Sequence, residues 1–157
     1  MGATLEEQIG ERLRLRGQRL ATAESCSGGL IAHRLTNVAG SSAYFLGGVV
    51  SYSNEAKVSM LGVKAQTLAT HGAVSEAVAR EMAEGARSRF ASDYAVACTS
   101  IAGPTGGTKE KPVGLVYIGA AGPGGTRVER CQFHGDRMSI KQQTADRALS
   151  LVLEALA

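Results

Sequence analysis

Two hydrophobic periods alternate along the sequence and predict alternating helices and strands. Apolar residues that recur every fourth position, such as Leu5, Ile9 and Leu13, are typical of an amphipathic helix. Short and nearly continuous apolar runs, such as residues 94–99, are typical of buried strands. Helices are expected at residues 5–16, 28–37, 54–61, 64–70, 76–90 and 138–156. Strands are expected at residues 19–23, 45–52, 94–99, 113–121 and 126–134.

The boundaries of several expected helices carry their own signals. Thr4 and Glu7 have the spacing of a capping box at the start of the first helix. Ser53 and Ser75 each stand in the N-cap position before a later helix, and Gly62 fits a C-terminal stop. These signals support the helix positions independently of the hydrophobic period.

The order of the elements predicts the fold class. Helices separate the first three strands, so these strands should pair in parallel through right-handed crossovers. No helix separates the third strand from the fourth, and a turn at residues 122–125 joins the fourth to the fifth, so the fourth strand should be antiparallel to its neighbours. The expected fold is a three-layer α/β/α sandwich with a mixed five-stranded sheet, and residues 1–157 should form a single domain. The run at residues 45–52 is nearly all apolar, which predicts a strand buried on both faces.

Charge and composition narrow the function classes. The net charge is +3, from 17 basic and 14 acidic residues, and no large basic face with interleaved aromatics indicates nucleic-acid binding. No apolar run approaches the roughly 20 residues that span a bilayer, and the N-terminus lacks signal-peptide regions, so we expect a cytoplasmic protein. The three cysteines and three histidines are widely spaced, which indicates neither a disulfide framework nor a metal site, and no cofactor is expected.

The segment from Thr22 to Gly29 places Ser25, Cys26 and Ser27 between an expected strand and an expected helix. Three interpretations fit it: a capped strand-to-helix turn, a glycine turn that binds a nucleotide, and a turn that presents a nucleophile. The nucleotide interpretation is the weakest, because neither a G-x-G-x-x-G nor a Walker pattern is present. A hydroxyl at this corner would lie beside backbone N–H groups at the start of a helix.

A base for such a serine follows from the topology. Lys57 comes after the second strand, and the carboxyl ends of parallel strands share one edge of the sheet, so Ser25 and Lys57 are expected to meet there. A lysine acts as a base only when its pKa is lowered toward neutrality; otherwise Lys57 is an ordinary surface residue. The loop at residues 103–107 and Arg137 follow other strands to the same edge. They suit a phosphate or a carboxylate, or else form a flexible connection and a surface cation.

The chain also resembles a known family along nearly its whole length. The motifs that carry the resemblance are AESCSGG (23–29), AGSS (39–42), YSNEAK (52–57), HGAVS (71–75), IAGP (101–104) with GG (106–107), KPVG (111–114) and GDR (135–137). Their order and content are similar to the successive signatures of the CinA C-terminal domain family, in its stand-alone form.

This resemblance implies a nicotinamide-nucleotide amidase, which hydrolyses nicotinamide mononucleotide (NMN) to nicotinic acid mononucleotide and ammonia in pyridine nucleotide salvage. It implies a serine–lysine mechanism without a metal, in which Ser25 is the nucleophile, Lys57 its base and Tyr52 an orienting or proton-relaying hydroxyl. Relatives suggest a homodimer or a larger homo-oligomer. The residues expected to hold the oxyanion or the substrate are Ser27, Gly28, Ser42, Gly103, Thr105, Gly106 and Arg137.

The sequence departs from the family pattern at three positions. Ser27 replaces the usual threonine, Ser100 stands where glycine is common, and Thr105 stands where an acid is frequent. These changes bear on substrate preference more than on the fold. Two other function classes stay open: a non-catalytic nucleotide-binding module linked to competence or DNA repair, and a hydrolase for another small amide.

Overall fold

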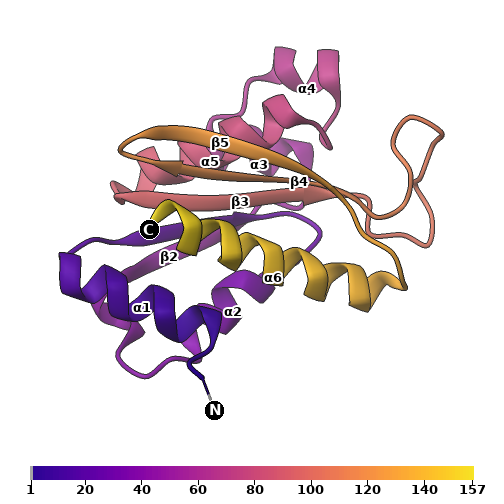
Figure 1. Ribbon diagram of the computed structural model, residues 1–157. Helices are drawn as coiled ribbons and strands as arrows, with labels where there is room; N and C mark the ends of the chain where they lie inside the picture. Colours follow the sequence, from indigo (N-terminus) through magenta and orange to yellow (C-terminus); the bar gives the residue numbers. More distant parts are fainter. Residues whose placement is uncertain (1) are drawn as a thin grey trace.

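The computed structural model describes residues 2–157 and is built from one mixed sheet with helices on both sides (Figure 1). The strands are β1 (Leu20–Glu24), β2 (Phe45–Val50), β3 (Tyr94–Ser100), β4 (Leu115–Gly122) and β5 (Gly125–Gln132). The helices are α1 (Leu5–Arg16), α2 (Leu30–Thr36), α3 (Asn54–Leu61), α4 (Ala65–His71), α5 (Glu76–Phe90) and α6 (Arg137–Ala155), with a 3-10 turn η1 (Ser41–Ala43) before β2.

The sheet has the strand order β2-β1-β3-β4-β5. β1 pairs in parallel with both β2 and β3, and β4 is antiparallel to β3 and to β5. This confirms the predicted mixed sheet with an antiparallel fourth strand. As a consequence, β1, β2, β3 and β5 all end at the same edge of the sheet, and the segments that follow them meet there.

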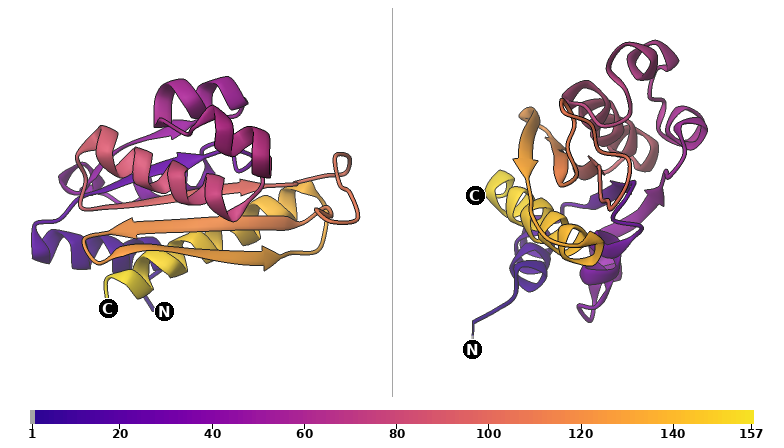
Figure 2. Two further views of the ribbon diagram at one scale, coloured as in Figure 1. Left: turned by 90° about the horizontal axis from the view of Figure 1, so that it is seen from above. Right: turned by 90° about the vertical axis from the view of Figure 1, so that its right-hand side faces the viewer.

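Helices lie on both sides of the sheet (Figure 2), and a hydrophobic layer holds them to each face. On one face, α1, α2 and α6 pack together against large side chains such as Leu20, Val96 and Ile118. On the other face, α3 and α5 cover a layer in which β1 and β3 contribute mainly alanines, such as Ala23 and Ala97. Because these strand residues are small, α5 packs close to β1 and β3.

A close backbone contact fixes α3 against α5. A Cβ atom added to Gly85 of α5 would lie only 1.8 Å from the carbonyl oxygen of Leu61, the last residue of α3. Only glycine permits this approach, because any side chain would push the two helices apart. The contact holds the end of α3, the helix that carries Lys57.

The capping predictions are confirmed. Thr4 and Glu7 form the reciprocal capping box of α1, and the Ser53 and Ser75 hydroxyls accept bonds from the first turns of α3 and α5. Gly62 ends α3 in the left-handed conformation. Each cap satisfies a backbone group that the helix itself leaves without a partner.

The predicted burial of the strand at residues 45–52 is wrong. β2 lies at the edge of the sheet and, among the strands of residues 2–157, pairs only with β1; each of its residues is half-buried or exposed, with Val50 48% exposed. An apolar run alone does not distinguish a central strand from an edge strand. The strand also ends at Val50, before Tyr52, and α2 begins at Leu30 because Gly28 and Gly29 adopt positive φ angles.

Among the helices of residues 2–157, none combines the length and the apolar character that crossing a lipid bilayer requires.

Candidate active site

Ser25 lies directly after β1, in the turn that leads to α2. The turn closes through a hydrogen bond from the Gly28 N–H to the Ser25 carbonyl oxygen at 3.0 Å. Gly28 has a φ of 64° and Gly29 a φ of 101°, a conformation that glycine adopts without strain. The turn places Ser25, which is only 5% exposed, at the carboxyl edge of the sheet.

A buried carboxylate anchors this turn from inside. Glu24, 1% exposed, accepts the Ser27 hydroxyl at 2.7 Å and the N–H groups of Ile31 and Ala32 at 3.0 Å each. The Ser27 oxygen also lies 3.0 Å from the Cys98 sulfur. Ser27 is therefore held by the interior of the turn. Glu24 was not among the residues predicted from the sequence, although a carboxylate at the end of an apolar strand indicates a buried polar role.

Lys57 reaches Ser25 from the second turn of α3. Its side chain is almost fully buried, and its Nζ lies 3.1 Å from the Ser25 Oγ. The same amine donates to the carbonyl oxygen of Ser51 at 2.8 Å and to that of Tyr52 at 3.4 Å. Within residues 2–157, Lys57 forms no ion pair with a carboxylate. The predicted meeting of Ser25 and Lys57 is present in the structure.

The surroundings of Lys57 favour its neutral form. Burial lowers the pKa of the amine below its usual range, against a smaller opposing influence of Cys26 and Cys98. Burial also raises the pKa of Cys98 to about 12, so this thiol stays protonated near neutral pH. An uncharged amine 3.1 Å from a serine oxygen can accept the hydroxyl proton.

Three residues predicted from the sequence, Tyr52, Gly103 and Arg137, contact one another at the rim of the site. The Arg137 guanidinium donates to the carbonyl oxygen of Gly103 at 2.7 Å and to the phenol oxygen of Tyr52 at 2.8 Å. Tyr52 is 59% exposed, and its hydroxyl contacts Arg137, whereas its backbone carbonyl contacts Lys57. Segments after β2, β3 and β5 therefore meet at one rim, beside the Ser25 turn after β1.

The remaining residues selected from the sequence lie at different distances from this centre. Thr105 and Gly106 lie in the exposed loop between β3 and β4, which extends beyond the ends of these strands (Figure 1). Ser42 lies in η1, immediately before β2, where Leu20 begins β1 and bonds to Tyr44. Because this is the amino edge of the parallel strands, the chain does not bring Ser42 together with Ser25.

Two backbone donors of the turn are open to a ligand. Within residues 2–157, the N–H groups of Cys26 and Ser27 donate no hydrogen bond, whereas that of Gly28 is engaged by Ser25. No three His, Cys, Asp or Glu side chains of these residues come together as a metal site.

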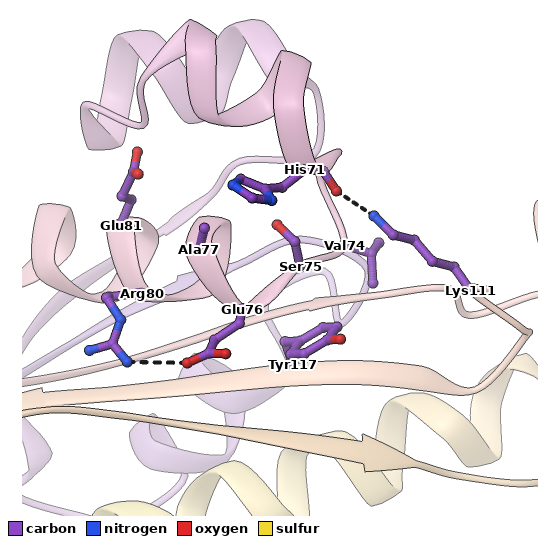
Figure 3. Close-up of a pocket in the computed structure, with 9 residues that line it drawn as sticks. All are labelled: His71, Val74, Ser75, Glu76, Ala77, Arg80, Glu81, Lys111 and Tyr117. Carbon is purple, nitrogen blue, oxygen red and sulfur yellow. Dashed lines mark hydrogen bonds and ion pairs between the residues drawn. The ribbon is translucent and has the colours of Figure 1, made fainter.

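A separate cavity of about 510 Å³ opens between α4, the start of α5 and β4 (Figure 3). Neither Ser25 nor Lys57 lines it. Its cations already have partners: Lys111 donates to the His71 carbonyl oxygen at 2.5 Å, and Arg80 pairs with Glu76 at 3.4 Å. Within residues 2–157 no side chain of this cavity forms a pair like that of the Ser25 hydroxyl and the buried Lys57 amine, and the Ser25–Lys57 centre is the better candidate.

Comparison with known proteins gives a consistent result. The model of the family described as CinA C-terminal domain matches residues 2–156. A CinA-like protein of Chloroherpeton thalassium is 55% identical over 156 residues, covering 97% of this chain and 37% of the relative. A CinA-like protein of Kosmotoga olearia is 51% identical over 153 residues, with 98% and 37% covered. The chain thus spans about 37% of the length of these curated relatives.

Solved structures match the whole fold. A competence/damage inducible protein from Agrobacterium tumefaciens is 42% identical with a TM-score of 0.89, and the match covers 99% of this chain and 98% of the other. A competence-damaged protein (CinA) superfamily member from Klebsiella pneumoniae is 39% identical with a TM-score of 0.92, and the match covers 97% and 95%.

Proposed function

Because the chain belongs to the CinA C-terminal domain family, we propose that it is an amidase that hydrolyses NMN to nicotinic acid mononucleotide and ammonia. The observation that carries the proposal is the 3.1 Å contact between the Ser25 hydroxyl and the buried Lys57 amine. Holding a lysine in the interior without a carboxylate partner costs stability. A role for the neutral amine as the base of Ser25 accounts for a burial that is otherwise unfavourable.

The reaction proceeds through an acyl-enzyme. Neutral Lys57 accepts the proton of Ser25, and the serine oxygen attacks the carboxamide carbon to form a tetrahedral intermediate. When the C–N bond breaks, protonated Lys57 donates its proton to the departing nitrogen, which leaves as ammonia. Water then attacks the Ser25 ester with Lys57 as its base, and the carboxylate product leaves as the serine regains its proton.

The open N–H groups of the turn suit the negative charge that develops on the carboxamide oxygen. Cys26 and Ser27 follow the nucleophile directly, and their N–H groups have no other partner within residues 2–157. One such donor typically lowers the barrier by about 3 kcal/mol. Glu24 holds the turn through Ser27 and α2, and this keeps the two donors in place before the substrate binds.

The rim formed by Arg137, Tyr52 and Gly103 would contact the ribose phosphate end of the nucleotide. Among residues 2–157, the Arg137 guanidinium bonds only to neutral oxygens, so its charge is available to an anion. Binding energy from this remote end positions the carboxamide against Ser25.

The experiment is ammonia release from NMN by the wild type and four variants. Ser25→Ala and Lys57→Met should each lower kcat by at least about 10³-fold, because the nucleophile and its base act as a unit. Ser27→Ala should keep measurable turnover, since Ser27 supports the turn. Lys64→Met, at the exposed start of α4, is the matched control and should equal the wild type.

Hydroxylamine provides a second measurement. It should convert the acyl-enzyme of the wild type to a hydroxamate, and no hydroxamate should form with Ser25→Ala. Full turnover by Ser25→Ala would exclude Ser25 as the nucleophile. A wild type that binds NMN but releases no ammonia would instead support a non-catalytic nucleotide-binding module.

A further inference from the structure

A second lysine approaches the nucleophile turn from the opposite face of the sheet. Lys141, on the second turn of α6, places its Nζ 3.6 Å from the position that a Cβ atom of Gly28 would occupy. Gly28 is bonded through its N–H to Ser25. The Lys141 ammonium group therefore lies at the turn that follows the proposed nucleophile, close enough that a methyl group on Gly28 would be in van der Waals contact with it.

The charge of Lys141 is not compensated by the protein. Its side chain is partly buried, yet within residues 2–157 it forms neither an ion pair nor a hydrogen bond. Arg147, further along α6, shows the contrasting arrangement, with ion pairs to Glu129 at 2.5 Å and to Glu154 at 2.9 Å. The carboxylate nearest in sequence to the turn, Glu24, is already occupied by three donors.

Lys141 and Arg137 act from one side of α6. They are four residues apart, so they lie on the same face of the helix. Arg137 reaches the Gly103 carbonyl and the Tyr52 phenol, and Lys141 reaches the Gly28 turn. Two cations without acidic partners thus stand along the rim, between the Ser25 turn and the loop after β3.

We propose that Lys141 binds the phosphate of the substrate together with Arg137, and thereby makes the enzyme select a nucleotide over the corresponding nucleoside. This inference rests on the proposed amidase function. A phosphate monoester carries about −1.5 to −2 charges at neutral pH and three acceptor oxygens, so it suits two cations that approach from one helix face.

The test compares NMN with nicotinamide riboside, which lacks the phosphate. Lys141→Met should lower kcat/KM for NMN by about tenfold, the low end for a hydrogen bond to a charged group at a partly exposed site. The loss should fall mainly on KM, because the contact binds ground state and transition state alike. Turnover of the riboside should not change, Lys141→Arg should restore NMN turnover, and Lys64→Met should match the wild type.

The dependence on salt provides a second measurement. The KM of the wild type for NMN should rise with ionic strength, and Lys141→Met should weaken that rise. An equal loss on NMN and the riboside, or no loss on either, would overturn the inference while leaving the amidase proposal intact. If the wild type does not hydrolyse NMN, the amidase proposal fails, and calorimetric binding of NMN to wild type and Lys141→Met then decides the role of Lys141: equal or absent binding overturns it.

Discussion

Replacing Lys57 by methionine should change how the stability of the protein depends on pH. Methionine keeps most of the length of the side chain and removes the amine. In the folded state, burial lowers the pKa of Lys57, whereas in the unfolded chain the amine has its ordinary pKa of about 10.4. Between these two pKa values, the unfolded state binds one proton more than the folded state.

The sign and the magnitude follow from proton linkage. Stability rises with pH wherever the unfolded state binds more protons, by about 1.4 kcal/mol per pH unit for one proton. Wild type should therefore gain stability relative to Lys57→Met as the pH rises from the folded pKa of Lys57 to about 10.4. Below the folded pKa, the difference between the two proteins should not depend on pH.

The difference between the two proteins isolates this lysine. Burial and neighbouring groups raise the pKa values of Cys98 and Cys131 to about 12, so both thiols destabilise the fold as the pH rises through their usual range near 9. Both variants contain both thiols, so this contribution cancels. Urea unfolding from pH 6 to 10 gives the difference directly, and the pH at which its slope begins is the folded pKa of Lys57.

The same pKa should appear in the kinetics. If neutral Lys57 is the base, kcat/KM for NMN should fall as the pH drops below the pKa of the free enzyme. Two independent measurements, unfolding and turnover, should therefore agree on one value. A pH-independent stability difference, or two values more than about one unit apart, would refute the assignment of Lys57 as a buried base.

Three further predictions concern the anchor of the Ser25 turn, the contact between α3 and α5, and an ion pair between β5 and α6. In Glu24→Gln, an amide NH₂ group replaces one of the two carboxylate oxygens that accept N–H groups of α2, and one N–H is left without an acceptor. The unfolding free energy measured in urea should therefore fall by about 2–4 kcal/mol. A change below about 0.5 kcal/mol would contradict the anchoring role. Gly85→Ala forces α3 away from α5, so it should lower the free energy of unfolding by about 1–3 kcal/mol and should also lower kcat. Unchanged turnover would contradict the close contact. Hydrogen bonding to Arg147 lowers the pKa of Glu129 to about 2, so wild type should lose stability relative to Glu129→Gln as acid titration proceeds from pH 4.5 to 2, and parallel curves would contradict the pairing.

The strand directions could be predicted because connection length constrains topology. A helix between two strands requires a parallel crossover, and a short turn requires an antiparallel pair. These two rules place Ser25 and Lys57 at one edge, and the 3.1 Å contact agrees with them. The burial of β2 could not be predicted, since sequence order does not show which strand lies at the edge of the sheet.

The site residues also divide into those whose position follows from the strand order and those whose position does not. Residues that follow β1, β2 or β5, such as Ser25, Lys57 and Arg137, lie at the carboxyl edge because these strands all end there. Ser42 precedes a strand and lies at the opposite edge, although its motif resembles those of the family. The approach of Lys141 to Gly28 depends on how α6 packs beside α2, and no periodicity in the sequence contains that information.

The backbone contacts around Lys57 keep its amine in the interior. A lysine without a carboxylate partner would move toward water if α3 or the end of β2 could yield. The carbonyl oxygens of Ser51 and Tyr52 accept its N–H groups, and the Leu61–Gly85 contact fixes the helix that carries it. Adding a carboxylate partner would stabilise the fold but would also raise the pKa of the amine and remove the base. The cost in stability and the capacity for catalysis therefore have the same origin: the interior surroundings of the Lys57 amine.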